Sequence, residues 1–264
     1  MKPAPFEYVA PRSVEEALGL LDGDATVLAG GQSLVPMMNF RLARPAKLVD
    51  VNRVEELAYL RDDDGVLRIG ALTRHTTLEH SDVIARGWRL LRQAVRHVGH
   101  PPIRARGTLG GSCAHADPTA ELPAALSALD ARFHLRSGQG DRVLGAPEFF
   151  VSYLTTALRA DELLVEVEVP PLPAGARTAF VEHARTHGDW AIAGAAVVVA
   201  PGQAAIALLG VDATPVRAAE AETALAGGAG AAEAARLAGG LAGGGSQAAL
   251  ATALVRRALE EAGA

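Results

Sequence analysis

Residues 28–36 have the sequence LAGGQSLVP, and this stretch decides how the chain is interpreted. An apolar, strand-like run leads directly into two glycines and two small polar side chains, so the backbone there carries little bulk. Glycine lets successive N–H groups converge on an anion, and the Ser33 hydroxyl adds a donor without filling the space that a pyrophosphate needs. One Gly-Gly pair alone is weak evidence for such a site.

A second stretch of the same kind, TLGGSCAHADP, lies at residues 108–118. Neither glycine cluster contains lysine or arginine, so phosphate charge would be met mainly by backbone dipoles. That suits a permanently held dinucleotide better than phosphoryl transfer, where a lysine normally follows the loop. The spacing matches neither G-x-G-x-x-G nor G-x-x-x-x-G-K-[ST], which disfavours a Rossmann or P-loop site. Together the two segments predict a nucleotide site built from two glycine loops.

The order and spacing of these motifs resemble the FAD-binding medium subunit of molybdenum hydroxylases, notably the carbon monoxide dehydrogenase and nicotine dehydrogenase branch, with xanthine dehydrogenase more distant. The resemblance covers nearly the whole chain. The segments that carry it are 29–36, 48–51, 69–73, 106–112, 148–150, 162–170 and 187–191.

The resemblance implies an α+β fold. It has a two-subdomain FAD-binding unit of the vanillyl-alcohol-oxidase (PCMH) type and a small C-terminal α+β domain with a three-stranded antiparallel sheet. The expected boundaries are residues 1–60 for the first FAD-binding subdomain, 61–173 for the second and 174–264 for the C-terminal domain. Apolar runs at 178–184, 191–200 and 204–211 predict the three C-terminal strands, and the Ala-rich tail predicts helices at 231–237 and 246–262.

Local signals place the remaining elements. Ser13 followed by Glu16 is typical of a capping box, which predicts a helix from there to about Leu21. Alternation and flanking turn residues predict strands, and apolar periodicity predicts helices. The expected strands are 25–29, 47–51, 66–70, 131–135 and 163–169, and the expected helices are 78–84, 90–98 and 123–129.

The same resemblance implies which residues contact FAD. Both glycine loops would wrap the pyrophosphate, Asp117 and Glu121 would reach ribose or ribityl hydroxyls, Val98 and Ile103 would line the adenine pocket, and Leu164 would pack near the isoalloxazine. The loop contacts are Ala29, Gly30, Gly31, Gln32, Ser33, Leu34, Thr108, Gly110, Gly111, Ser112 and Ala114.

Three positions depart from the family pattern. Ser112 replaces an asparagine common among relatives, and Glu121 replaces the aspartate of xanthine dehydrogenases; both keep a polar group available. Trp190 stands where tyrosine or phenylalanine is frequent, and we expect it to stack on the flavin ring or shield it from oxygen. The roles of Trp190 and His115 are left open at this stage.

Composition narrows the functional classes. The 264 residues are 49% hydrophobic with a net charge of -5, so the chain can bury a substantial core but carries no basic stripe for nucleic acid. The N-terminus has no apolar signal core and no apolar run is long enough for a membrane span, so we expect a cytoplasmic protein. The eight histidines show no metal-binding spacing, and we expect neither a metal site nor a catalytic acid or base.

The single cysteine, Cys113, cannot hold an iron–sulfur cluster by itself. We interpret it as a small buried side chain that packs in the core. The molybdenum cofactor and 2Fe-2S centres would therefore belong to a large molybdopterin-binding subunit and a small iron–sulfur subunit, with the resemblance implying a dimer of heterotrimers. The leading hypothesis is that FAD here takes electrons from the 2Fe-2S centres and passes them to an external acceptor. A stand-alone FAD-dependent oxidase and a non-redox nucleotide-binding or assembly module remain as alternatives.

Overall fold

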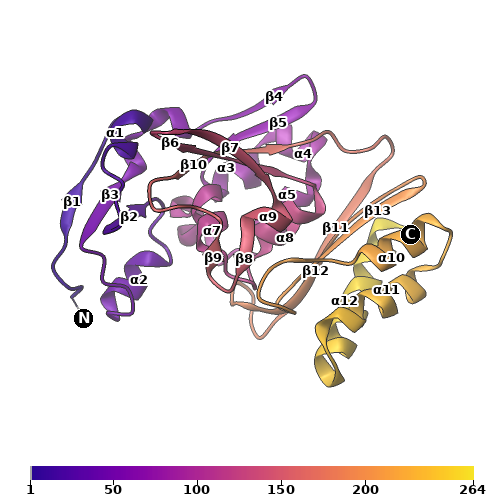
Figure 1. The fold of residues 1–264 in the computed structure, drawn as a ribbon. Coiled ribbons are helices and arrows are strands. Elements are labelled where there is room, and N and C mark those ends of the chain that lie inside the picture. Colours follow the sequence, from indigo (N-terminus) through magenta and orange to yellow (C-terminus); the bar gives the residue numbers. More distant parts are fainter. Residues whose placement is uncertain (1) are drawn as a thin grey trace.

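The computed structural model describes residues 2–264, and its N-terminal lobe is built on a three-stranded parallel sheet. Glu7–Val9 (β1) and Ala25–Leu28 (β2) each pair with Lys47–Asp50 (β3), which lies between them (Figure 1). Val14–Leu18 (α1) packs its buried side chains against this sheet, whereas Leu34–Asn39 (α2) follows β2 directly. The lobe therefore presents the chain between β2 and α2 at one end of its sheet.

A five-stranded antiparallel sheet in the order β4-β5-β10-β6-β7 forms the centre of the molecule. Its strands are β4 (Leu60–Asp63), β5 (Val66–Gly70), β6 (Arg132–Ser137), β7 (Gly140–Gly145) and β10 (Leu163–Val169). Helices lie against one face of this sheet and bury the largest apolar cluster, in which Phe133 and Phe149 stack at 4.3 Å between ring centroids. Those helices are α3 (His75–His80), α4 (Asp82–Gly87), α5 (Arg89–Val95), α7 (Leu109–His115), α8 (Glu121–Ala128) and α9 (Ala146–Phe149), and α6 (Pro101–Arg106) packs on α3.

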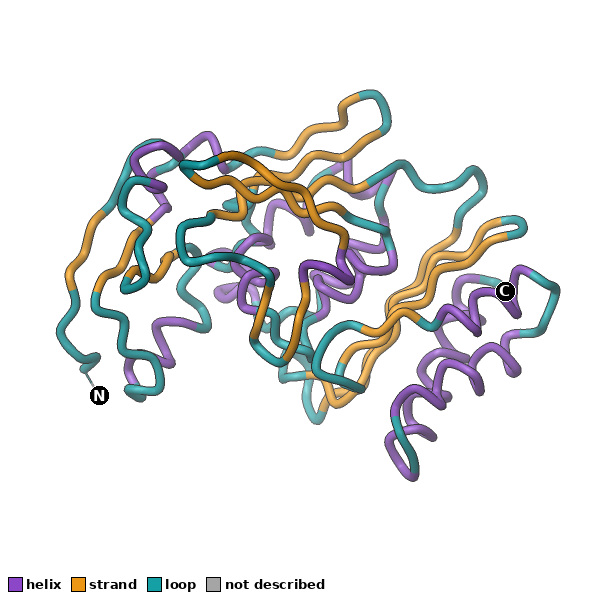
Figure 2. Tube along the Cα trace, in the orientation of Figure 1, coloured by secondary structure: helices purple, strands orange, loops and turns teal. Residues whose placement is uncertain are grey.

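The C-terminal part is a second antiparallel sheet covered by helices on one face. Figure 2 shows these helices as a separate layer beyond the long strands. Alanines on β11 and β12 let α12 approach closely, while Phe180 on the other face of the sheet joins the central core beside α5 and α8. The elements are β11 (Arg177–Ala184), β12 (Ala191–Ala200), β13 (Gln203–Leu209), β14 (Val216–Arg217), α10 (Ala219–Ala226), α11 (Ala231–Gly239) and α12 (Gly245–Ala262).

The short elements complete the chain. A two-stranded hairpin links α9 to the central sheet, and its tip approaches the C-terminal end of α7, where the Leu154 N–H donates to the Ala116 carbonyl at 3.2 Å. These elements are β8 (Phe150–Ser152), β9 (Thr155–Thr156) and the 3-10 helices η1 (Val51–Arg53), η2 (Glu55–Leu57) and η3 (Gly240–Ala242).

Several predicted elements differ in the structure. The helix predicted at 78–84 is two helices, because Ser81 takes an extended conformation (ψ 127°) and its hydroxyl caps α4. The helix expected to reach Leu21 ends at Leu18, and the Glu16 carboxylate accepts from the Arg12 N–H, not from that of Ser13. The C-terminal sheet has four strands because β14 adds to the three predicted ones. Among residues 2–264, no helix combines the length and the apolar character needed to cross a bilayer.

Candidate functional site

The first glycine segment is a loop that leads from β2 into α2. Gly31 takes a left-handed conformation (φ +73°), which reverses the chain and exposes the amides that follow. Within residues 2–264, the backbone N–H groups of Gln32, Ser33 and Leu34 donate to no protein acceptor. Three adjoining free donors of this kind make a binding surface for an anionic or polar group.

The second glycine segment is not a loop, contrary to the prediction. Residues 109–115 form α7, and Thr108 is its N-cap, with Oγ1 accepting from the Gly111 N–H at 3.1 Å. The Leu109 N–H donates to the Thr73 carbonyl and the Gly110 N–H to the Ala71 carbonyl. These backbone donors are therefore satisfied inside the protein, and the hydroxyl groups of this segment become its main side-chain donors for a ligand.

The glycines are needed because backbones approach one another closely, at Gly30 where the two lobes meet and at Gly110 within the central part of the molecule. A Cβ atom at Gly30 would lie 2.5 Å from the Arg106 carbonyl oxygen, and one at Gly110 would lie 2.6 Å from the Ala71 Cβ. At Gly111 the nearest atom of the N-terminal lobe would be the Ala29 Cβ at 3.9 Å. The structure thus brings the two predicted segments together, with β2 and α2 facing α7 across the junction (Figure 1).

A polar network beneath this junction holds the two lobes in register. Arg74 donates to the Asn52 Oδ1 at 2.7 Å and to the Arg106 carbonyl, while the Asn52 amide donates to the Ala29 carbonyl at 2.8 Å. Burial lowers the pKa of Arg74, and the nearby Arg106 lowers it further. No sequence pattern indicated Arg74 or Asn52, because their partners are distant along the chain.

Asp50 connects this network to β1. Its carboxylate accepts from the Tyr8 hydroxyl at 2.6 Å and from the Asn52 backbone N–H at 2.9 Å. Burial acts to raise the pKa of Asp50, but these hydrogen bonds outweigh it and the net pKa lies below the ordinary value. Asp50 is therefore an anion that fixes Asn52 beside the first glycine loop.

Asp117 and Glu121 lie just beyond α7 and differ in chemistry. Asp117 Oδ1 already accepts from the backbone N–H and the hydroxyl of Thr119, at 2.8 and 2.7 Å, so its other oxygen is the one available to a ligand. Burial raises the pKa of Glu121 to about 8, and the neighbouring Glu182 and Asp117 carboxylates raise it as well. Glu121 thus holds a proton at neutral pH and can donate a hydrogen bond.

The other predicted contacts are scattered. Leu164 is buried in the central core, at 4% exposure, and Ala114 is exposed on α7. Trp190, at 76% exposure, lies in the turn between β11 and β12, which packs against residues 99–100. Because Gly99 also contacts Ile103, the turn carrying Trp190 lies beside the segment that contains Val98 and Ile103. The segment that contains Ile103 leads directly to the second glycine segment, because the Gly107 N–H donates to the Ile103 carbonyl at 2.7 Å.

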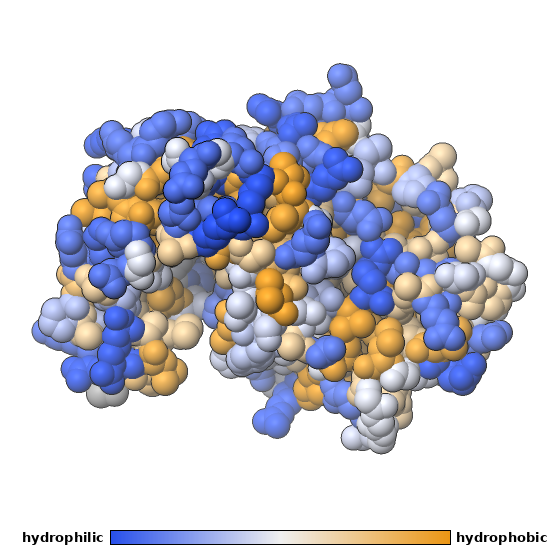
Figure 3. All heavy atoms as spheres, viewed as in Figure 1, coloured by the Kyte–Doolittle hydropathy of each residue, from blue (hydrophilic) through white to orange (hydrophobic). Residues whose placement is uncertain are grey.

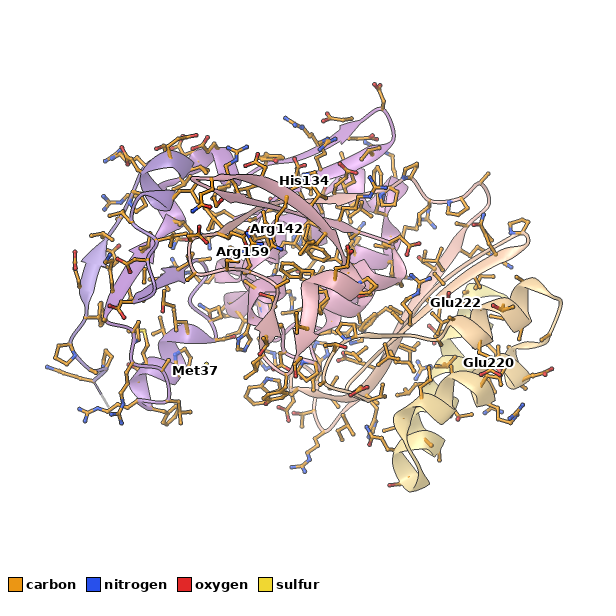
Figure 4. The ribbon with its side chains drawn as sticks, viewed as in Figure 1. Met37, His134, Arg142, Arg159, Glu220 and Glu222 are labelled. Carbon is orange, nitrogen blue, oxygen red and sulfur yellow. The ribbon has the colours of Figure 1, made fainter. Side chains whose placement is uncertain are left out.

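One cluster of side chains has the composition of a metal site, but an arginine side chain already pairs with its carboxylates. His134 Nε2 lies 3.7 Å from Glu166 Oε1 and 3.4 Å from Glu168 Oε2. The Arg68 guanidinium pairs with those same two oxygens, at 2.6 and 3.1 Å. Figure 4 shows His134 on the central sheet, well apart from α2 where Met37 is labelled. We therefore assign these side chains to an ion-pair network on the open face of the sheet.

Cavities do not mark the predicted site. A cavity of about 810 Å³ lies between β6, β7 and α9 on one side and residues 212–217 on the other, and none of the predicted cofactor contacts lines it. The surface is instead hollowed between the lobe that carries α2 and the rest of the molecule (Figure 3). The site is therefore identified by its glycine segments and free donors.

Comparison with known proteins agrees with this geometry. The family described as "FAD binding domain in molybdopterin dehydrogenase" matches residues 4–172. The 6-hydroxypseudooxynicotine dehydrogenase complex subunit alpha of Paenarthrobacter nicotinovorans is 49% identical over 234 residues, covering 85% of this chain and 79% of the relative.

Solved structures are similar over nearly the whole chain. A chain of the carbon monoxide dehydrogenase from Hydrogenophaga pseudoflava superposes with a TM-score of 0.93 at 39% identity, covering 99% of this chain and 98% of that one. A chain of quinoline 2-oxidoreductase from Pseudomonas putida 86 superposes with a TM-score of 0.91 at 36% identity, covering 99% and 98%. The mixed α/β fold is thus that of these oxidoreductase chains.

Proposed function

Because the chain belongs to the family of FAD-binding domains in molybdopterin dehydrogenases, we propose that it is the FAD-containing electron-transfer subunit of a heteromeric molybdenum hydroxylase. The observation that carries the proposal is the meeting of two glycine segments at the lobe junction, with three free backbone N–H groups on one of them. Bound FAD would supply the redox chemistry; the chain itself binds and orients it.

The donors at the junction fit a pyrophosphate. The N–H groups of residues 32–34 and the hydroxyls of Ser33 and Ser112 are neutral donors, and Gly30 and Gly111 leave the backbone bare beside them. The free oxygen of Asp117 can accept from a sugar or ribityl hydroxyl, whereas protonated Glu121 can donate to an oxygen or nitrogen acceptor. Thr108, Gly110 and the remaining predicted loop residues would support these contacts through the shape of the backbone that they form.

The hydrophobic contacts follow from the position of Trp190. An extended dinucleotide has its adenine and its flavin ring at opposite ends. Since Val98 and Ile103 lie beside the turn that carries Trp190, the three residues would serve the same end of the cofactor. We therefore propose a shared site for Val98, Ile103 and Trp190 in place of separate adenine and flavin contacts, with Leu164 buried in the central core.

The proposed partner chains would hold the redox centres for which this chain does not supply ligands. Cys113 is buried, and burial raises the pKa of its thiol, so it offers no thiolate for a cluster. We propose that a large molybdopterin-binding chain and a small 2Fe-2S chain supply the other centres, in a dimer of heterotrimers. On this proposal residues 1–60 and 61–173 form the two halves of the FAD site, residues 174–264 form the third domain, and the complex works in the cytoplasm.

The test is expression of this chain together with its genomic neighbours, followed by purification through a tag on this chain, absorbance spectroscopy and metal analysis. Flavin, iron and molybdenum in one complex support the proposal. Flavin without a partner chain favours a stand-alone oxidase, and a complex with no flavin favours an assembly module.

A further inference from the structure

His75 lies directly beneath the second glycine segment. It is the first residue of α3, it is 3% exposed, and its backbone N–H donates to the Gly107 carbonyl at 3.0 Å. A Cβ atom at Gly107 would lie 2.7 Å from the ring Nδ1, so the imidazole packs against bare backbone. The ring is therefore held rigidly under residues 107–112.

The ring is neutral, and only one of its nitrogens carries hydrogen. Burial lowers the pKa of His75 to about 4; the nearby Thr108 backbone opposes this shift, although neither ring nitrogen makes a hydrogen bond of good geometry to it, and the charges of Arg104 and Arg74 add to it. In a neutral imidazole one nitrogen donates and the other accepts. Which nitrogen donates is set by the neighbours of each.

Those neighbours favour hydrogen on Nε2. Nε2 lies 3.1 Å from the Ser112 Oγ, whereas the buried Nδ1 has no hydrogen-bond partner within residues 2–264. A buried N–H without an acceptor is rarer in proteins than a buried acceptor without a donor. The tautomer that leaves no buried N–H without an acceptor therefore carries its hydrogen on Nε2, directed at the Ser112 Oγ.

We propose that His75 is a positioning residue whose Nε2–H donates to the Ser112 Oγ and so directs the Ser112 hydroxyl hydrogen outward, toward a phosphate oxygen of the bound dinucleotide. This inference rests on the proposed function. With the opposite tautomer, the Ser112 hydrogen would point at the ring, and only oxygen lone pairs would face an anion.

The rest of the segment explains why one hydroxyl matters. The N–H groups of residues 109–111 are all used inside the protein, and the Thr108 N–H, which has no protein acceptor within residues 2–264, belongs to a residue that is only 2% exposed. Thr108 shows the same arrangement as Ser112, because its Oγ1 accepts the Gly111 N–H, but it is only 2% exposed. Ser112 is thus the accessible donor of this segment, and its direction depends on His75.

The tautomer can be measured without any activity assay. The full chain, labelled with ¹⁵N-histidine and loaded with FAD, is examined by long-range ¹H–¹⁵N correlation NMR, and the His75 signals are assigned by comparison with His75→Gln. We expect a neutral ring with the proton on Nε2. A proton on Nδ1 overturns the proposal.

A double-mutant cycle tests whether His75 acts through Ser112. FAD affinity is measured by quenching of flavin fluorescence in the wild type, His75→Leu, Ser112→Ala and the double variant, because leucine has no donor for Ser112. We expect each single variant to weaken binding about tenfold and the double variant to be no weaker than Ser112→Ala, within about twofold. A purely structural role of His75 predicts instead that His75→Leu costs the same factor in both backgrounds.

Asparagine at position 112 provides the matched control. Its side-chain amide always carries donors, so Ser112→Asn should restore affinity relative to Ser112→Ala and make binding insensitive to His75→Leu. If Ser112→Asn binds well but still loses about tenfold with His75→Leu, the proposal is wrong. If the wild-type chain binds no FAD, the proposed function itself fails, which is a distinct outcome from a failed cycle.

Discussion

Replacing Gly30 with alanine tests whether the lobe junction is the cofactor site. The new Cβ would lie 2.5 Å from the Arg106 carbonyl oxygen and 2.8 Å from the Gly107 Cα, and both are backbone atoms that cannot rotate away. Ordinary contact would need roughly 1 Å more space. The two segments must therefore move apart at the point where they are proposed to grip the pyrophosphate.

The size of the effect follows from the cost of overpacking, which is about 1–3 kcal/mol. If that cost is expressed in FAD binding, the Kd rises by roughly 5- to 150-fold. Titration of the apoprotein with FAD, followed by flavin fluorescence, measures this change. Thermal unfolding with and without FAD gives a second readout, because a ligand that binds only the folded state raises its stability according to the Kd.

Gly23→Ala is the matched control, since a Cβ there would meet no atom within 4 Å. We expect its FAD affinity to equal that of the wild type. The reasoning is refuted if Gly30→Ala keeps the wild-type Kd, whether or not its stability falls, because the close approach at Gly30 would then lie outside the cofactor site.

Three further predictions concern buried groups. Because the pKa of His75 is about 4 when folded and near 6.5 when unfolded, the wild type should lose stability as the pH falls from 6.5 to 4, by up to roughly 3 kcal/mol in urea unfolding, and His75→Gln should lose less. Glu121 has the opposite sign: because its folded pKa is raised to about 8, its contribution to stability is complete below about pH 4.5 and is lost as the pH rises through 8. Glu121→Gln should therefore flatten that decline in the stability of the apoprotein. An unchanged slope would contradict the burial argument. Cys113 should not react with a thiol reagent in the native protein and should react readily after unfolding in guanidinium, whereas rapid native labelling would show that its site is open.

Both segments of the site can be located from the sequence, but the prediction that the second segment is a loop is wrong. Glycine pairs favour loops because glycine weakens helices, and this reasoning holds for residues 30–31, where Gly31 has a positive φ. At residues 110–111 tertiary packing overrides the propensity: Gly110 is glycine because α7 lies directly against Ala71, not because a ligand lies there. Thr108 as N-cap was the available signal for a helix, and it was assigned to cofactor binding instead.

The residues that hold the junction together were not predictable from one chain. Arg74, Asn52 and Asp50 each look like ordinary surface polar residues in the sequence. Their role comes from one chain of hydrogen bonds: Asp50 fixes Asn52, and Asn52 accepts from Arg74 across the two lobes. His75 shows no metal spacing and no catalytic motif, so only its burial and its contact with Ser112 distinguish it from the other histidines. Long-range pairs of this kind have no local periodicity that a sequence pattern could detect.

The two lobes offer different kinds of donor to a phosphate, and this difference has a consequence for how FAD would be held. The N-terminal lobe offers the free backbone N–H groups of residues 32–34, whereas α7 offers the Ser112 hydroxyl, because its own amides are already used. The half-buried guanidinium of Arg74 donates to Asn52 and to the Arg106 carbonyl, so it fixes the junction. A pyrophosphate bound there would be shared between lobes by neutral donors, with each lobe supplying what the other lacks. FAD would then stabilise the junction itself, which suits a cofactor that stays bound while electrons pass through it.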